Sequence, residues 1–256
     1  MRKFSIVAKK DDQSIEIAQK IKDGLISHMI YDEENPELVI SVGGDGTMLY
    51  SVHKYIHLLD YVKFVGIHTG TLGFYTDYAK EEYEELIKDI LKNKYTIQYR
   101  AMLDVCIDDM CYQALNEVRI ENNRRAQVLN VYINDEELEV FRGNGLCIST
   151  SSGSTAYNKS IGGAVISSSN DLMQLSEIAG IHHNAYRSLG SSLILDRSHV
   201  ITIRSSNLNN SILGVDQDVY ELNDSSTITI QLSDKKVQCV QYKEVSLISR
   251  LKRSFF

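Results

Sequence analysis

Apolar residues follow two different periods along this chain, and the change falls near residue 97. Before it, short apolar runs alternate with stretches in which apolar side chains recur every three or four positions, which predicts alternating strands and helices. The strands are expected at 4–8, 38–42 and 64–67, and the helices at 15–29, 47–56 and 80–92. Such alternation is typical of a mainly parallel sheet with helices on its faces, so we expect an α/β domain over residues 1–96.

After residue 97 the apolar positions alternate with a period of two, which predicts strands. These are expected at 99–107, 112–120, 129–133, 138–141, 145–149, 200–204 and 227–232, with Asn134-Asp135 as a hairpin turn and a possible helix at 171–179. The pattern indicates a second, β-rich domain over residues 97–242, with a cleft between the two domains. A short segment, 243–256, follows it.

The stretch Gly43-Gly44-Asp45-Gly46-Thr47 joins a predicted buried strand to a predicted helix, with Thr47 near the helix N-cap. Glycines let the backbone approach a bulky anion closely, and such turns bind phosphates in open α/β sheets. The two commonest nucleotide fingerprints are absent, and the loop carries an acid that they lack. This combination suggests phosphoryl transfer. A tight turn in which Asp45 bonds nearby backbone N–H groups is an equally good interpretation of the five residues alone.

A second unusual stretch, residues 141–163, is dense in serine, threonine and glycine and contains Tyr157. Hydroxyls and backbone N–H groups of this kind can bind a ribose or a pyrophosphate, and a tyrosine can stack on a ring. The alternatives are a flexible surface loop for the stretch and a core aromatic for Tyr157.

Composition narrows the class of protein. The formal net charge of −7 argues against a dedicated nucleic-acid binder. No apolar run approaches the ~20 residues that span a bilayer, and the N-terminus is unlike a signal peptide, so we expect a cytoplasmic protein without a membrane partner.

The four cysteines form no C-x-x-C pair and have no histidine at ligand spacing, so we expect no metal site made by the protein alone. Cys106 and Cys111 are five apart and would face opposite sides of one unbroken strand. All four cysteines are therefore expected to be small, buried, apolar and reduced.

Four blocks together resemble the NAD kinases, in that family's order. The blocks are Gly43–Thr47, Leu72-Gly73-Phe74, Asn116-Glu117 and the Gly-Ser-Thr-Ala-Tyr-Asn-Lys-Ser-x-Gly-Gly run from Gly153. The first block is shared with diacylglycerol, sphingosine and 6-phosphofructo-kinases, whereas the last is far more specific.

The resemblance implies a C-terminal β-sandwich, a final segment that returns to the N-terminal domain, and a homodimer or homotetramer. It implies NAD and ATP as substrates, with Mg²⁺ or another divalent cation accompanying ATP. Asp45 matches the catalytic acid that accepts or hydrogen-bonds the 2′-hydroxyl of the adenosine ribose. The ATP phosphates would meet Gly43, Gly44, Gly46 and Thr47. The NAD-binding positions would be Asp45, Gly46, Phe74, Asn116, Glu117, Arg142, Asn144, Ser152, Thr155, Ala156, Tyr157, Ser160 and Gln217, with Ala179 and Tyr186 from a neighbouring subunit, and Asp216 is a possible second acid.

Three positions depart from the family pattern. Asn144 stands where the family usually has an aspartate, which puts affinity for the cationic nicotinamide end in doubt. Ser151 and Ala164 stand where the family has prolines. These departures keep open a non-catalytic NAD-binding or sensor protein, and the shared first block keeps open a lipid kinase of the diacylglycerol type. None of the three departures removes Asp45 or the ribose-binding positions.

Overall fold

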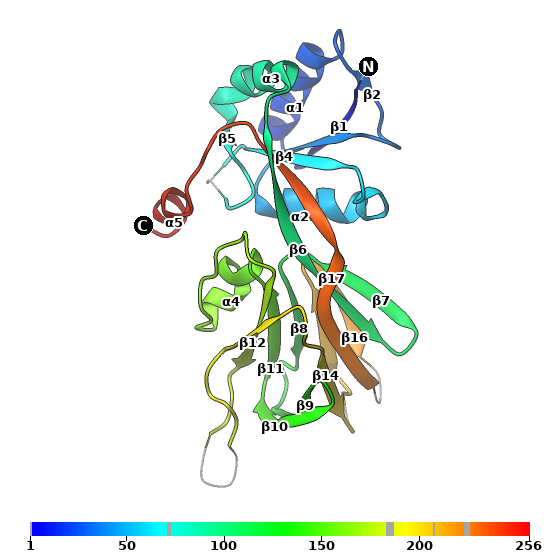
Figure 1. Cartoon of the computed structure of the whole chain (residues 1–256), viewed down its shortest axis with the longest axis vertical. Coiled ribbons are helices and arrows are strands. Elements are labelled where there is room, and N and C mark those ends of the chain that lie inside the picture. Colours follow the sequence, from blue (N-terminus) through cyan, green and yellow to red (C-terminus); the bar gives the residue numbers. More distant parts are fainter. Residues whose placement is uncertain (1, 71–72, 183–186, 207, 223–225) are drawn as a thin grey trace. The chain divides into compact units, whose positions relative to one another are not determined.

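The computed structural model describes residues 2–70, 73–182, 187–206, 208–222 and 226–256 (Figure 1). The chain divides into two compact units. Unit 1 consists of residues 1–99 and 237–256, and unit 2 consists of residues 100–236. The last twenty residues therefore belong with the N-terminal part of the chain.

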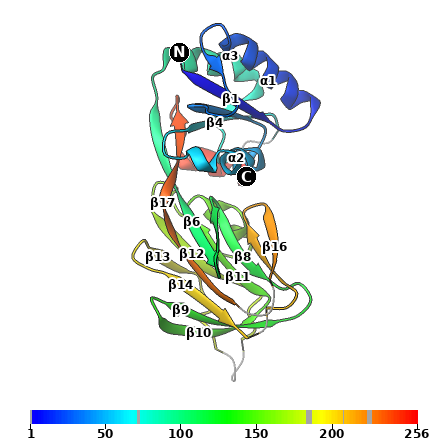
Figure 2. The ribbon, with the colours of Figure 1, turned by 90° about the vertical axis from the view of Figure 1, so that its right-hand side faces the viewer.

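Unit 1 is built on a parallel sheet in the order β2-β1-β3-β4, with β5 beside β4. Helices α1 and α3 lie on one face and α2 on the other, as both views show (Figures 1 and 2). Between the sheet and helices α1 and α3 lie the fully buried side chains of Phe4, Ile21, Ile40 and Leu86. The elements are β1 (Lys3–Ala8), α1 (Asp12–Leu25), β2 (Ile30–Tyr31), β3 (Leu38–Val42), α2 (Asp45–Lys54), η1 (Ile56–Leu58), β4 (Lys63–His68), β5 (Tyr78–Ala79), η2 (Lys80–Glu82) and α3 (Tyr83–Lys92). The predicted α/β domain with a parallel sheet is confirmed.

Helix α2 begins at Asp45, earlier than the sequence indicated. Gly44 is its N-cap, and the Gly44 carbonyl accepts the N–H groups of Thr47 and Met48. Those bonds close the first turn over Asp45 and Gly46, so Thr47 lies inside the helix.

Unit 2 is a sandwich of two mainly antiparallel sheets. The first contains β6 (Thr96–Ile107), β7 (Met110–Ala114), β9 (Gln127–Ile133), β10 (Glu136–Gly143), β14 (Ile201–Ser205) and β17 (Ser226–Gln241). The second contains β8 (Glu117–Glu121), β11 (Gly145–Thr150), β12 (Leu172–Ile178), β13 (Leu193–Asp196), β15 (Ser211–Val215) and β16 (Asp218–Leu222). A core with Leu103, Val131, Ile148 and Leu213 lies between them, because each strand points alternate side chains inward. The predicted β-rich second domain is confirmed as a β-sandwich.

Two predicted elements of unit 2 are wrong. Residues 172–178 form strand β12 between β11 and β13, not a helix. Apolar residues at 172, 175 and 178 mimic a helical stripe, but pairing on both edges fixes the extended form. The predicted strand 112–120 is two strands, because Leu115 and Asn116 leave the ladder and bond the Asp216 carboxylate instead.

The cysteine prediction is also wrong for one pair. β6 and β7 form a hairpin that turns at Asp108-Asp109, so Cys106 and Cys111 lie directly opposite each other and form a disulfide. The turn, with Asp108 at φ 50°, ends the single strand on which the sequence argument relied. Cys147 and Cys239 are buried free thiols, as expected.

This pairing predicts a thiol count. Protein purified without reductant and unfolded in denaturant should react with a thiol reagent at Cys147 and Cys239 only, and should react at two further sites after reduction. A Cys111→Ser variant, which frees Cys106, is the control and should show one extra reactive thiol before reduction. Four reactive thiols in the unreduced wild type would contradict the paired hairpin.

The end of the chain packs within unit 1. Gln238 and Cys239 of β17 pair in parallel with the start of β4. Helix α5 (Leu247–Phe255) begins after Ser246, whose side chain accepts the Ser249 N–H. Arg250 donates to the carbonyls of Phe74 and Thr76 and forms a buried ion pair with Asp77, so α5 braces the loop that follows β4. Among the described residues, no helix has the length and apolar character needed to cross a membrane.

Candidate active site

The glycine loop of unit 1 combines one crowded glycine with two open ones. Gly43 has φ +155°, and a Cβ there would lie 2.2 Å from Thr47 Oγ1. A Cβ at Gly44 or Gly46 would meet no atom within 4 Å. Gly43 is therefore glycine so that the loop can fold, whereas Gly44 and Gly46 leave space unfilled.

That space is a cavity of about 610 Å³. Ligand sites typically have volumes of about 300–1,000 Å³. Its walls combine basic side chains, hydroxyls and bare backbone: Ala8, Lys9, Lys10, Gly44, Gly46, Thr47, Tyr50, Thr69 and Gly70. The N-terminus of the ten-residue helix α2 lies in this wall, and the helix dipole and its unpaired N–H groups favour an anion there. The cavity therefore suits a polyphosphate.

The two kinds of glycine predict opposite failures. Gly43→Ala should lower the free energy of unfolding by about 1–3 kcal/mol, because its Cβ collides with Thr47 and its backbone is strained. Gly44→Ala should fold normally but raise the KM for ATP, the donor that the resemblance implies, by about tenfold. The added methyl would occupy the cavity and remove roughly one charge-assisted hydrogen bond to the phosphates. Thermal unfolding and steady-state kinetics of the two variants test this. Equal effects of both substitutions on stability and on KM would contradict the assignment.

The Asp45 carboxylate is held by a distant loop. Its Oδ2 accepts the N–H of Phe74 at 2.8 Å, and its Oδ1 accepts the N–H of Tyr75 at 2.9 Å. Gly73 has no room for a side chain, since a Cβ would lie 2.0 Å from Asp45 Oδ1. The structure thus brings together Gly43–Thr47 and Phe74, two of the blocks found in the sequence. Leu72 lies outside the described residues.

In unit 2, the face of the second sheet that points away from the core is polar. Glu117, Arg119 and Glu121 occupy alternate positions of β8 on this face, while Val118 and Ile120 point into the core. Cys147 and Ser149 lie beside them on β11. Sequence analysis identified Glu117 but missed Arg119 and Glu121. Their signal was the alternation of charged and apolar residues over 117–121.

Asp216 positions the Asn116-Glu117 pair. It adopts φ +52° in the turn after β15, and its buried carboxylate accepts the N–H groups of Leu115, Asn116 and Glu117 at 2.8, 2.7 and 3.2 Å. Three such bonds occupy the carboxylate, which fits a positioning role better than a second acid. Gln217 is exposed in the same turn.

The serine-rich segment is a packed structure. It contains η3 (Gly153–Thr155) and α4 (Tyr157–Ser160) and covers the polar face of the second sheet. Asn158 accepts a bond from Ser176 of β12, and Gly153 lies so close to Asn116 that a Cβ would be 2.0 Å from the Asn116 carbonyl oxygen. The alternative of a flexible surface loop is therefore wrong. Ser152 is buried and contacts Arg100, Thr155 and Ala156 are half-buried, and Ser160 is exposed.

Tyr157 lies over the charged row of β8. Its hydroxyl donates to Glu121 Oε1 at 2.8 Å, and the Arg119 guanidinium carbon lies 4.7 Å from the ring centroid. Burial and the neighbouring Glu121 raise the pKa of Tyr157 to about 12, so the phenol stays protonated and acts as a donor. The ring is half-buried on this face and is not a core aromatic.

Three further predicted positions meet at the end of β10 and β12. The Arg142 carbonyl accepts the N–H of Ile181 at 2.8 Å, and the Asn144 N–H donates to Ile178 at 3.0 Å. Ala179 follows with φ +47°. The Asn144 side chain donates from Nδ2 to the Asn122 carbonyl at 2.9 Å, a bond that an ionised aspartate cannot make. Tyr186 lies outside the described residues.

Glu117 is the most perturbed acid of this face. Burial and then the nearby Asp216 raise its pKa to about 7, with a smaller rise from Glu121, while Arg119 opposes them. Its Oε2, the Ser149 Oγ and the Arg119 Nε are buried without a hydrogen-bond partner within the described part of the chain. Buried polar atoms are rarely left unpaired, so these three atoms leave unused hydrogen-bonding capacity on this face.

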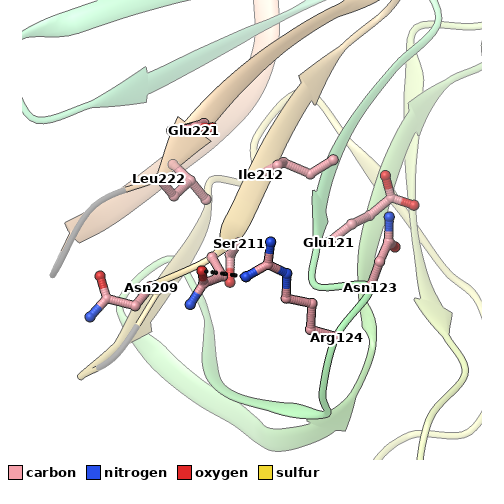
Figure 3. A pocket seen from close by; sticks show the side chains of 9 residues that line it. Glu121, Asn123, Arg124, Asn209, Ser211, Ile212, Glu221 and Leu222 are labelled. Atoms are coloured by element: carbon pink, nitrogen blue, oxygen red, sulfur yellow. Dashed lines mark hydrogen bonds between the residues drawn. The ribbon is translucent and has the colours of Figure 1, made fainter.

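A second cavity lies in unit 2 near the end of β8 (Figure 3). Its volume is about 390 Å³, and Arg124 donates to Asn210 at 3.2 Å within it. Glu121 reaches its wall, together with Asn123, Asn209, Ser211, Ile212, Glu221 and Leu222. None of the predicted site residues lies in this wall.

Comparison with known proteins agrees with the resemblance seen in the sequence. The family profile described as the ATP-NAD kinase N-terminal domain matches residues 5–95, and that of the ATP-NAD kinase C-terminal domain matches residues 115–242. NAD kinase of Geobacillus stearothermophilus is 39% identical over 259 residues, covering 98% of this chain and 96% of the relative. NAD kinase 1 of Bacillus anthracis is 38% identical over 260 residues, covering 99% and 98%.

Two solved structures show the same fold. Yeast NADH kinase complexed with NADH superposes with a TM-score of 0.83 at 19% identity, covering 99% of this chain and 87% of that one. An NAD kinase from Archaeoglobus fulgidus in complex with ATP gives a TM-score of 0.78 at 23% identity, covering 98% and 99%. Both domain profiles match, and the relatives are similar over nearly the whole chain, so this chain belongs to the NAD kinase family.

Proposed function

We propose that this chain transfers the γ-phosphoryl group of ATP to the 2′-hydroxyl of the adenosine ribose of NAD, giving NADP. The observation that carries the proposal is the glycine loop of unit 1. There the Asp45 carboxylate is fixed by two backbone N–H groups, and its neighbours in sequence, Gly44 and Gly46, line a cavity together with two lysines. Relatives that are named NAD kinase and that match nearly the full chain support the same activity.

The cavity of unit 1 takes the phosphates of ATP. Phosphoryl transfer proceeds largely through a loose transition state, so positioning and charge neutralisation supply most of the catalysis. Gly44 and Gly46 offer backbone N–H groups, Thr47 offers a hydroxyl, and Lys9 and Lys10 offer positive charge. The sequence interpretation had not assigned the two lysines.

Asp45 orients the acceptor hydroxyl. Both of its oxygens already accept a backbone N–H, and each keeps a further lone pair for a hydroxyl donor. The carboxylate therefore holds the 2′-hydroxyl in line and takes its proton late, as the bond to phosphorus forms.

A divalent cation such as Mg²⁺ enters with ATP. Within the described residues, no group of three or more His, Cys, Asp or Glu side chains is arranged to hold a metal ion. Mg²⁺ usually keeps several waters and is held through substrate phosphates, so we expect phosphate and water oxygens to bind the ion. The ion would neutralise phosphate charge.

Unit 2 supplies the NAD-binding groups. The unpartnered Glu117 Oε2 and Ser149 Oγ suit ribose hydroxyls, and Tyr157 suits a ring of the dinucleotide. Asn116 and Glu117 are fixed by Asp216, and Ser152, Thr155 and Ala156 lie in the packed segment beside them.

The test is incubation with MgATP and NAD, followed by detection of NADP with an NADP-specific dehydrogenase. We expect NADP in proportion to enzyme and time. Tight NAD binding without NADP would leave a non-catalytic sensor, and phosphorylation of diacylglycerol in place of NAD would make the chain a lipid kinase. NADH and polyphosphate in parallel reactions identify the preferred acceptor and donor.

A homodimer or homotetramer and a cytoplasmic location remain proposals. Val128, Leu138 and Val140 form an exposed apolar row on the β9–β10 hairpin, which supports self-association. Sedimentation analysis of the purified chain tests the oligomeric state.

A further inference from the structure

We infer that Arg119 is a positioning residue for NAD, because its guanidinium holds the Tyr157 ring and is the cation that lies beside the Glu117 carboxylate. The inference rests on the proposed function, which places these two groups against NAD. Arg119 has no role in the sequence interpretation of the site.

Arg119 lies in the middle of the charged row of β8, with its side chain only 18% exposed. Its Nη1 bonds Glu121 Oε2 at 2.9 Å, and its Nε lies 3.9 Å from Glu117 Oε1. Gly214 on the adjacent strand β15 makes this possible, since a Cβ there would lie 2.9 Å from Arg119 Nη2. The guanidinium thus occupies one defined position over the sheet.

The same Arg119–Glu121 pair fixes the Tyr157 ring at two points. The guanidinium covers one face of the ring at 4.7 Å, and Glu121 accepts the phenol hydroxyl at 2.8 Å. A cation over a tyrosine face contributes about 0.5–2 kcal/mol, more when the pair is shielded from water. Because one face is covered by Arg119, a ligand ring stacks on the other face, in an orientation that the pair determines.

Arg119 also sets the charge of Glu117. Within the described part of unit 2, the groups that face Glu117 are Asp216 from the turn after β15, Arg119 and Glu121 from β8, and Cys147 and Ser149 from β11. Arg119 is the one cation among them, and the only one of these groups that lowers the pKa of Glu117. Without it, an acid that already titrates near neutrality would remain protonated.

The ionised form of Glu117 is the form that binds a ribose. A carboxylate accepts hydrogen bonds from both vicinal hydroxyls, whereas a protonated acid has lost part of that capacity. The three unpartnered buried atoms, Glu117 Oε2, Ser149 Oγ and Arg119 Nε, lie on this one face. Arg119 therefore prepares both contacts with the dinucleotide, the stacked ring and the diol.

The test compares Arg119→Met and Arg119→Lys with wild type across pH 5.5–9. Arg119→Met should raise the KM for NAD about tenfold or more at pH 7.5, the equivalent of one charge-assisted hydrogen bond, with a much smaller change in kcat and in the KM for ATP. The acid limb of kcat/KM for NAD should move up by about one pH unit as a charge neighbour is lost. Arg119→Lys keeps the charge, so it should restore the acid limb while the KM for NAD stays raised.

The matched control is Arg204→Met, which removes an arginine 4.8 Å from the Tyr132 ring in the first sheet of the same unit. It should leave the KM for NAD and the pH profile unchanged. Wild-type values for both quantities in Arg119→Met, or an equal rise in the KM for ATP, would overturn the inference. If Arg119→Met does not fold, Arg119→Lys decides, because a wild-type KM for NAD in that variant also overturns it. A wild type that makes no NADP would instead refute the proposed function.

Discussion

Replacing Asp45 with asparagine is expected to lower kcat by about 10²–10⁴-fold, the range of a positioned proton acceptor. Asparagine keeps the size of the side chain but turns one acceptor into an NH₂ donor. That donor would face the N–H group of Phe74 or Tyr75, and it cannot take the proton of the 2′-hydroxyl. Steady-state kinetics should show the loss in kcat with a smaller change in the KM for NAD.

Asp45 holds the Phe74–Tyr75 loop in addition to its proposed role toward the hydroxyl, so the control must remove a similar loop contact elsewhere. Asp32 provides it, because its Oδ1 accepts the N–H groups of Glu34 and Asn35 in the same unit. Asp32→Asn affects a matched pair of loop hydrogen bonds, and the exposed ion pair with Lys3 adds little, so it should reduce thermal stability to a similar degree and keep near-wild-type kcat. A wild-type kcat in Asp45→Asn, or an equal loss of kcat in Asp45→Asn and Asp32→Asn, would contradict the assignment of Asp45.

Replacing Glu117 with glutamine is expected to stabilise the protein and to weaken NAD binding at the same time. The pKa of Glu117 is about 7 in the folded protein, against an ordinary value of 4.5, because burial and Asp216 disfavour the anion. Between those values the folded protein holds the proton that the unfolded chain releases. Stability of the wild type therefore falls as the pH rises from about 4.5 to about 7.

At pH 8 the ionised Glu117 destabilises the folded protein by an amount on the order of 3 kcal/mol, which an uncharged glutamine removes. Thermal unfolding should therefore show a higher Tm for Glu117→Gln at pH 8, and a much smaller gain at pH 5. The affinity for NAD at pH 8 should fall by about tenfold or more, the loss of a charge-assisted bond. If the gain in Tm of Glu117→Gln over wild type were smaller at pH 8 than at pH 5, the assignment of a destabilising buried charge to Glu117 would be contradicted. Unchanged NAD affinity would contradict its contact with the substrate.

The fold class could be predicted because hydrophobic periods are local. The three- and four-residue spacing of Ala18, Ile21 and Leu25 and the largely apolar run 38–42 both report burial in the immediate surroundings. Strand β12 was missed because its two neighbouring strands, which come from residues 145–150 and 193–196, decide its conformation. Cys106 and Cys111 were misjudged for a similar reason, since a two-residue turn reverses the strand between them.

The candidate site was predictable where its chemistry is contiguous in sequence. The composition of Gly43–Thr47 predicts a phosphate-binding loop. The structure then distinguishes Gly43, which the loop needs in order to fold, from Gly44 and Gly46, which leave space. The alternative interpretation of Asp45 foresaw bonds to nearby N–H groups, but the actual partners, Phe74 and Tyr75, come about thirty residues later. No local pattern could pair them, because β4 intervenes between the two loops.

Arg119 also shows that contacts between residues distant in the sequence could not be predicted. Its charge and its alternation on β8 are visible in the sequence, but its contacts with Glu121, Tyr157 and Gly214 depend on β15 and α4. Asp216 likewise serves the Asn116-Glu117 pair from a hundred residues away. These groups are assembled by the sandwich, and only its register identifies them.

The central claim is that Asp45 acts on the 2′-hydroxyl of the adenosine ribose of NAD. An NAD analogue that lacks only this hydroxyl, called 2′-deoxy-NAD here, tests the claim most directly. The purified chain is incubated with MgATP and either NAD or 2′-deoxy-NAD, and phosphorus NMR locates any new phosphate. We predict a 2′-phosphate on NAD and no phosphorylation of the deoxy analogue, which should still bind and compete with NAD. A phosphate at any other position, or phosphorylation of 2′-deoxy-NAD, would contradict the role assigned to Asp45.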